Sequence, residues 1–124
     1  MANVLIDTDI VIEVMRSNQS VIEDVKNLWQ RGNVLFCSPV TVAEVYHGLR
    51  SDEVNKVEQF FRTIRCLPVT KEVGEKAGEY LSKYHKSNGV ELGDALIAAA
   101  SFFNKTSLYT LNNKHYPMGD IKLL

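Results

Sequence analysis

Apolar residues along this chain follow two patterns, short continuous runs and longer segments with helical spacing. The short runs are rich in Val, Ile, Leu and Tyr, which is typical of buried strands. They predict strands at residues 4–6, 34–37, 66–69, 108–111 and 121–124. Because Pro68 interrupts the third run, that strand is expected at the periphery of the sheet.

The segments with helical spacing predict helices that alternate with these strands. Their expected ranges are 10–15, 19–31, 39–50, 54–64, 73–88 and 92–104. Thr8 or Asp9 is expected to cap the first helix, and Ser38 with Pro39 to begin the third. The last helix is apolar on almost every side, so we expect it to be buried.

Alternating strands and helices imply right-handed crossovers between parallel strands. The predicted fold class is therefore α/β, with a central parallel β-sheet of four to five short strands flanked by helices. A chain of 124 residues, 45% of them apolar, has material for one compact core. We expect a single domain over residues 1–124.

Charge and composition exclude several classes of protein. A net charge of −1 and a pI near 6.3 give no basic footprint for nucleic acid, so phosphate binding must come from a local patch or from metal ions. The longest uncharged stretch, residues 32–43, is shorter than the roughly 20 apolar residues of a membrane helix, and the N-terminus lacks a signal-peptide pattern.

Cys37 and Cys66 are expected to be buried thiols of a cytoplasmic protein, with a single bridge between them left open.

Three acidic residues do not fit their surroundings. Asp7 stands where the first strand ends, at the sheet edge where ligands bind in open α/β sheets. Asp94 is the one charged residue in the first turn of the apolar last helix, and Glu44 flanks the apolar face of another helix. Two of them have plainer interpretations: Asp94 as an acid stabilised by the helix dipole, and Glu44 as half of a capping box with Thr41 or as a solvated acid. A fourth acid, Asp9, is interpreted as a helix cap.

Taken together, these positions predict a cation site. Asp7, Glu44, Asp94 and Asn112 each follow a core strand or lie near the start of a helix, so their side chains can converge above the sheet edge. Carboxylates held close together repel one another unless a cation lies between them. Because all the ligands are oxygen atoms, the expected ion is Mg²⁺ or Mn²⁺ rather than zinc.

Four segments of the chain resemble a known family, the PIN-domain ribonucleases, in order and spacing. They are IDTDI at 6–10, SPVTVAEVYHGL at 38–49, GDALIAA at 93–99 and YTLN at 109–112. More narrowly, the whole chain resembles the VapC toxins of prokaryotic toxin–antitoxin pairs. The resemblance implies a PIN-like three-layer sandwich and a Mg²⁺- or Mn²⁺-dependent endoribonuclease. It also implies a cognate VapB-like antitoxin, a homodimer, and metal ligation by Asp7, Glu44 and Asp94.

The segment after the fourth strand departs from the family pattern. Asn112 and His115 stand where carboxylates are found in other members. We expect Asn112 to join the three acids as a catalytic residue that orients a metal-activated water, and His115 to lie at the surface. Thr8 and Asp9 are expected to support the ligands. The cations nearest to the acidic segments, which we guess contact the RNA backbone, are Arg16, Arg50 and Lys114.

The residues also allow other functions. Asp7-Thr8-Asp9 is similar to the strand-end signature of haloacid-dehalogenase-like phosphatases, although the chain has no acidic pair at a later strand end. A receiver-like phosphoacceptor domain is another alternative, although the chain lacks the paired acids after the first strand and the lysine expected of such a domain. A third alternative is a binding module that keeps the fold but has lost its metal. Cleavage of RNA with Mg²⁺, abolished by EDTA, would separate the nuclease from the phosphatase and from the binding module.

Overall fold

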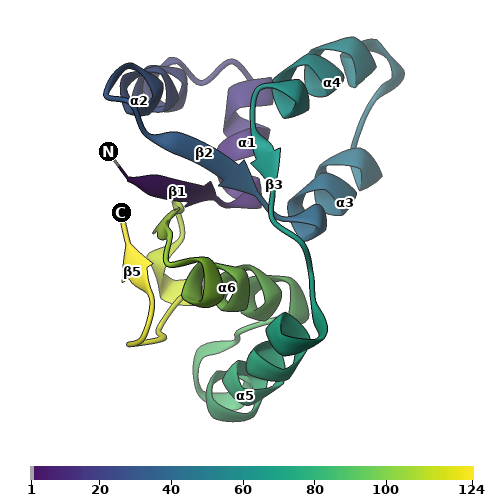
Figure 1. The fold of residues 1–124 in the computed structure, drawn as a ribbon. Helices are drawn as coiled ribbons and strands as arrows, with labels where there is room; N and C mark the ends of the chain where they lie inside the picture. The colour runs from purple at the N-terminus through teal and green to yellow at the C-terminus, as the bar shows by residue number, and fades with distance from the viewer. Residues whose placement is uncertain (1) are drawn as a thin grey trace.

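The computed structural model describes residues 2–124, which form a five-stranded parallel sheet with helices on both faces (Figure 1). The strand order is β3-β2-β1-β4-β5. The strands are β1 (Asn3–Ile6), β2 (Val34–Cys37), β3 (Arg65–Cys66), β4 (Ser107–Tyr109) and β5 (Lys122–Leu123). Because every pair is parallel, the carboxyl ends of β1, β2 and β4 meet at one edge. The predicted fold class is confirmed.

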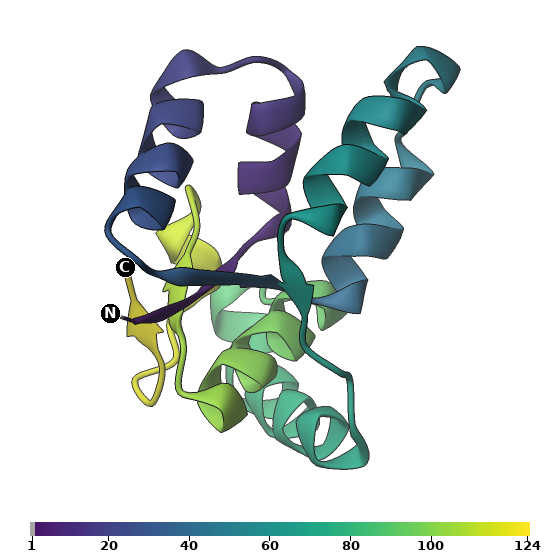
Figure 2. The ribbon, with the colours of Figure 1, turned by 45° about the horizontal axis from the view of Figure 1, so that its top comes forward.

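The helices form two layers with the sheet between them (Figure 2). They are α1 (Thr8–Met15), α2 (Gln19–Gln30), α3 (Pro39–His47), α4 (Val54–Arg62), α5 (Lys71–Asn88) and α6 (Leu92–Asn104), with short 3₁₀ turns at Ser51–Glu53 (η1) and Asn113–His115 (η2). None of them, within residues 2–124, is long and apolar enough to cross a membrane.

Side-chain alternation along β1 explains the two layers. Val4 and Ile6 belong to the core that α1, α2 and α4 cover, whereas Leu5 belongs to the core beneath α5 and α6. Successive residues of a strand point to opposite faces, so a strand buried on both sides is a continuous apolar run. The helix expected to be buried, α6, has a nearly continuous row of buried residues from Ala95 to Ser101.

Several element ends differ from the prediction. Helix α3 ends at His47, before Gly48, and β3 is a two-residue strand that pairs only with β2. The expectation of a peripheral third strand is confirmed. Its position at the sheet edge leaves Cys66 exposed, so the prediction that both cysteines are buried is wrong for this residue. Both thiols are free, although Cys37 and Cys66 are register partners on adjacent strands.

Candidate metal centre at the carboxyl edge of the sheet

Asp7 lies at the centre of a polar cluster where β1 and β4 end side by side. Its side chain is only 7% exposed. One carboxylate oxygen accepts a hydrogen bond from the Thr8 backbone N–H at 2.8 Å, and the other accepts from the Thr110 hydroxyl at 2.8 Å. Asp7 is therefore the N-cap of α1, and the prediction that Thr8 or Asp9 caps this helix is wrong. Parallel pairing of β1 with β4 is what brings Thr110 to Asp7.

Glu44 is tied to the same cluster through Thr8. The Thr8 hydroxyl donates to Glu44 Oε1 at 2.6 Å and lies 3.0 Å from the buried hydroxyl of Thr41. Since a hydroxyl has one proton, Thr41 is the donor in its contact with Thr8. The N-cap of α3 is Ser38, so Glu44 lies inside the helix and is not part of a capping box.

Asp94 lies in the first turn of α6, where its Oδ2 accepts a hydrogen bond from the Glu91 N–H at 3.1 Å. The plainer interpretation, an acid at a helix start, is thus correct for its local contacts. Burial raises the pKa of Asp94, and the negative charges of Asp7 and Glu44 raise it further, against the Glu91 hydrogen bond and His115, which lower it. The charges of Asp7 and Glu44 therefore act on the carboxylate of Asp94.

Gly93 allows Glu44 to approach the start of α6. A Cβ at position 93 would lie 3.4 Å from Glu44 Oε2 and 3.4 Å from Val40 Cγ1, which is van der Waals contact. The Glu44 carboxylate therefore packs directly against the first turn of α6, the turn that carries Asp94.

Asp9 is the second residue of α1, and its carboxylate faces the loop that follows β4. Its Oδ2 accepts from the Leu111 N–H at 2.9 Å. It also shares the single proton of the Thr110 hydroxyl with Asp7, at the longer distance of 3.3 Å. Burial raises the pKa of Asp9, and the charge of Asp7 contributes in the same direction. The interpretation of Asp9 as a helix cap is wrong. These contacts end β4 before the predicted residue 111, because Thr110 and Leu111 are bonded to the side chain of Asp9.

The loop after β4 also places Asn112 and His115 near the acids. His115 Nδ1 lies 3.6 Å from Asp94 Oδ2, and the imidazole is 43% exposed. The expectation that His115 lies at the surface is therefore only half right, because the ring contacts Asp94. The Asn112 side-chain amide lies 3.2 Å from His115 Nδ1, and its backbone N–H donates to Thr110 Oγ1 at 3.0 Å. The role of Asn112 in orienting water stays a prediction.

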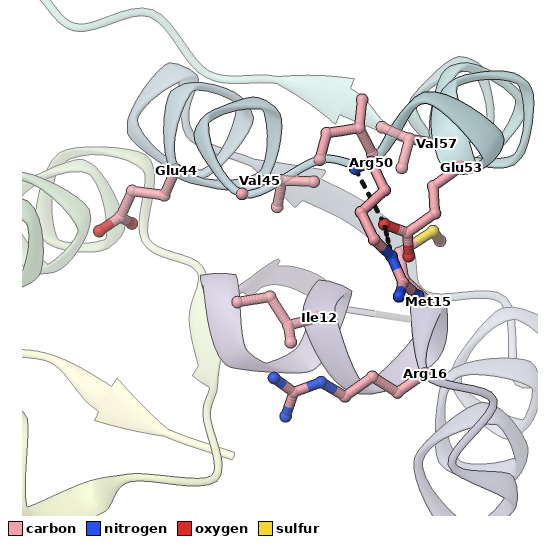
Figure 3. Close-up of a pocket in the computed structure, with 10 residues that line it drawn as sticks. Ile12, Met15, Arg16, Glu44, Val45, Arg50, Glu53 and Val57 are labelled. Atoms are coloured by element: carbon pink, nitrogen blue, oxygen red, sulfur yellow. Dashed lines mark hydrogen bonds and ion pairs between the residues drawn. The ribbon is translucent and has the colours of Figure 1, made fainter.

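A groove of about 400 Å³ runs beside Glu44 between α1 and the segment from α3 to α4. Two of the predicted RNA contacts, Arg16 and Arg50, line it. Figure 3 shows the Glu44 carboxylate pointing away from both guanidinium groups. Arg16 pairs with Glu13 at 3.4 Å and Arg50 with Glu53 at 3.3 Å, while Lys114 is exposed on η2. Contact of these three cations with RNA stays a prediction.

Two polar residues of the cluster were given no role from the sequence. Thr110 enters the sequence-based prediction only as part of the YTLN motif, although its hydroxyl is hydrogen-bonded to both Asp7 and Asp9. Tyr116 is buried, and its hydroxyl has no hydrogen-bond partner. Tyrosine instead of phenylalanine at a buried position next to a candidate motif is the signal that could have found it, because a buried tyrosine hydroxyl normally has a partner.

The donor chemistry of the cluster suits a hard divalent cation. Asp7, Glu44 and Asp94 supply carboxylate oxygens, the ligands that Mg²⁺ and Mn²⁺ prefer, and their mutual repulsion is what a cation would remove. In residues 2–124 no group of three His, Cys, Asp or Glu side chains is already arranged around a common point that could hold an ion. The residues fit such a cation in chemistry and charge, and their side chains would have to move in order to surround one.

Comparison with known proteins identifies the class. The PIN domain family model matches residues 4–119, and the chain belongs to this family. Its relatives include ribonuclease VapC10 of Mycobacterium tuberculosis, which is 32% identical over 116 residues, covering 93% of this chain and 86% of the relative. Ribonuclease VapC19 of the same organism is 29% identical over 115 residues, covering 92% of each chain. The predicted resemblance to PIN-domain proteins of the VapC type is confirmed, and it sets aside the phosphatase and receiver folds.

Solved structures show the same fold. A chain in the crystal structure of VapBC2 from Rickettsia felis, bound to a promoter DNA fragment, superposes with a TM-score of 0.82 at 18% identity, covering 98% of this chain and 97% of that one. A chain of the DNA-bound VapBC from Salmonella typhimurium gives a TM-score of 0.82 at 18% identity, with 100% and 98% covered. At this identity the likeness concerns the fold alone.

Proposed function

We propose that this protein is an endoribonuclease that depends on Mg²⁺ or Mn²⁺ and acts as the toxin of a toxin–antitoxin pair. The observation that supports the proposal is the position of Asp7, Glu44 and Asp94, which three separate elements bring to the carboxyl edge of the sheet. The charges of Asp7 and Glu44 both act on the carboxylate of Asp94. The names of the relatives, ribonucleases VapC10 and VapC19, support RNA as the substrate.

Each part of the cluster has a role in this reaction. Asp7, Glu44 and Asp94 would hold the cation, which would supply activation of water and neutralisation of charge on the scissile phosphate. Thr8 and Thr110 fix the Glu44 and Asp7 carboxylates without adding positive charge. The products expected of such hydrolysis are a 5′-phosphate and a 3′-hydroxyl.

An antitoxin of the VapB kind is the proposed partner, and a homodimer the proposed assembly. The solved relatives are VapBC complexes, which supports the first of these. Expression of the chain alone should arrest bacterial growth, and co-expression of its antitoxin should restore it. Growth that is unaffected by the chain alone would argue for a binding module without catalysis.

Matched glutamate variants test the nuclease directly. Glu44 and Glu23 are both exposed acids within helices, but only Glu44 belongs to the cluster. With Mn²⁺ and a mixed RNA substrate, Glu44→Gln should abolish cleavage and Glu23→Gln should cleave like the wild type. EDTA should abolish cleavage by the wild type. Full RNA cleavage in EDTA, or by Glu44→Gln, would refute the proposal. Hydrolysis of p-nitrophenyl phosphate would instead support a phosphatase activity.

A further inference from the structure

A buried hydroxyl without a partner lies beside the proposed metal ligands. In residues 2–124, only two fully buried side-chain polar atoms lack a hydrogen bond, Asp9 Oδ1 and Tyr116 Oη. Both belong to residues whose pKa is raised in part by the charge of Asp7. Unsatisfied buried groups are rare in folded proteins, so two in one cluster require an explanation.

The Tyr116 ring and its hydroxyl have different environments. The ring belongs to the core beneath α5 and α6, and the residue is only 3% exposed. Burial raises the pKa of Tyr116, and the carboxylates of Asp7 and Asp94 raise it further. A tyrosine hydroxyl is protonated at neutral pH, so it is a potential donor to these acids. Its contact with Asp7 is close enough to raise the pKa as a hydrogen bond would, yet it falls short of hydrogen-bond geometry.

Packing does not explain this hydroxyl. Phenylalanine would fill the same core volume without burying an unsatisfied donor, which costs stability. Asp7, in contrast, has acceptor capacity to spare. An ionised carboxylate has about four lone-pair positions, and the Thr8 N–H and the Thr110 hydroxyl occupy one on each oxygen. A third donor would fix the carboxylate and leave a position for a cation.

We infer that Tyr116 is a positioning residue for Asp7. In the cation-loaded protein its hydroxyl donates a hydrogen bond to the Asp7 carboxylate and holds it in the orientation that binds the ion. This inference rests on the metal site of the proposed function. Partners of this kind fix the orientation of metal ligands, and their loss weakens metal affinity by about 10- to 100-fold.

Tyr116→Phe tests the inference, with Tyr80→Phe as the matched control. Tyr80, on α5, is also 3% exposed, but its hydroxyl has a partner outside the acidic cluster. It donates a hydrogen bond to Asp120 at 2.7 Å. Calorimetric titration of each full-length protein with Mn²⁺, without RNA, measures affinity. Thermal unfolding in EDTA measures the metal-free stability.

The two variants should differ in Mn²⁺ affinity, and their unfolding midpoints in EDTA should shift in opposite directions. Tyr116→Phe should weaken Mn²⁺ binding by about 10- to 100-fold and raise the midpoint of unfolding in EDTA. Tyr80→Phe should leave Mn²⁺ binding unchanged and lower that midpoint, because Asp120 loses a donor. A purely structural role for Tyr116 would change the midpoint but not the affinity.

Three results would overturn the inference. If the wild type binds Mn²⁺ and Tyr116→Phe binds it equally well, the inference fails while the proposed function stands. If Tyr116→Phe unfolds at a lower temperature in EDTA, the hydroxyl is already bonded in the metal-free protein. If the wild type binds no Mn²⁺, the proposed metal site fails, and the role of Tyr116 fails with it.

Discussion

Replacing Asp94 by asparagine separates the charge of this side chain from its local contacts. In the wild type, Asp94 Oδ2 accepts the Glu91 N–H at 3.1 Å in the first turn of α6. The asparagine carbonyl can accept the same bond, so the start of the helix is kept. What the substitution removes is one negative charge from a side chain that is 20% exposed.

Two opposing effects set the change in stability. A carboxylate at a helix start gains about 0.3–1 kcal/mol from the helix dipole, and this is lost in the variant. Burial and the repulsion from Asp7 and Glu44, which together raise the pKa of Asp94, are relieved. Because the raised pKa shows that the site disfavours the charge, we expect Asp94→Asn to leave the metal-free protein equally stable or more stable, by no more than about 1 kcal/mol at pH 7.

The pH dependence has a definite sign. An aspartate whose pKa is raised by folding contributes stability below its unfolded pKa, near about 3.9, and loses that contribution as the pH rises through the folded pKa. Asp9, whose pKa is also raised, acts in the same direction. The stability of wild type and variant should therefore converge as the pH falls toward about 4 and separate toward neutral pH.

Two assays check these expectations. Urea unfolding in EDTA, followed by the fluorescence of the single tryptophan, Trp29, gives the free energy of unfolding at each pH. Cleavage of RNA in Mn²⁺ should fall at least about a hundredfold, since loss of an anionic ligand removes several kcal/mol of charge stabilisation from the reaction. Wild-type cleavage by Asp94→Asn would refute the role of this charge. A loss of more than about 2 kcal/mol of stability at pH 7 would refute the assignment of net repulsion.

Two further substitutions test supporting contacts. Thr8→Val should reduce cleavage, because Glu44 loses its 2.6 Å hydrogen-bond donor. It should also lower the free energy of unfolding in urea by about 1–3 kcal/mol, because the buried Thr41 hydroxyl loses its partner. An unchanged rate and an unchanged stability would contradict both contacts. Lys105→Gly should stabilise the protein by up to about 1 kcal/mol without changing cleavage, since Lys105 ends α6 at a φ of 52°, where a side chain is strained. A less stable Lys105→Gly variant would show that the lysine side chain contributes more than the strain costs.

The strands and helices were predictable because each face of the sheet is covered. Burial on both sides makes Val4 to Ile6 a continuous apolar run, and such a run is visible without knowledge of its neighbours. Strand β2 is apolar throughout as well, although Val34 at its start is exposed. Strand and helix ends were less predictable where tertiary contacts decide them. The segment after Tyr109 has strand-forming residues, yet β4 stops there because Asp9, about a hundred residues earlier in the chain, binds the Leu111 N–H.

The acidic residues of the site were predictable for a different reason. A carboxylate such as Asp94 within an apolar helix is conspicuous because burying its charge is costly. Hydroxyl groups carry no such signal, since threonine and tyrosine are common both in strands and at the edges of cores. Thr110 acquires its contact with Asp7 from the pairing of β4 with β1, and no local pattern in the sequence encodes that neighbour. For Tyr116 the one signal is a tyrosine where phenylalanine would suffice, and this signal has meaning only once burial of the residue is known.

The kind of donor that holds each carboxylate distinguishes a cation site from a structural ion-pair network. In the part of the chain that the structure describes, Lys and Arg side chains pair with Glu13, Glu53, Glu79 and Asp120, and none pairs with Asp7, Glu44 or Asp94. The cluster is fixed instead by neutral hydroxyl and amide donors, and His115 lies beside Asp94. Neutral donors orient carboxylates without cancelling their charge. Burial, and to a smaller extent the charges of Asp7 and Glu44, raise the pKa of Asp94 in the folded protein, and an external cation is the partner that would offset both effects.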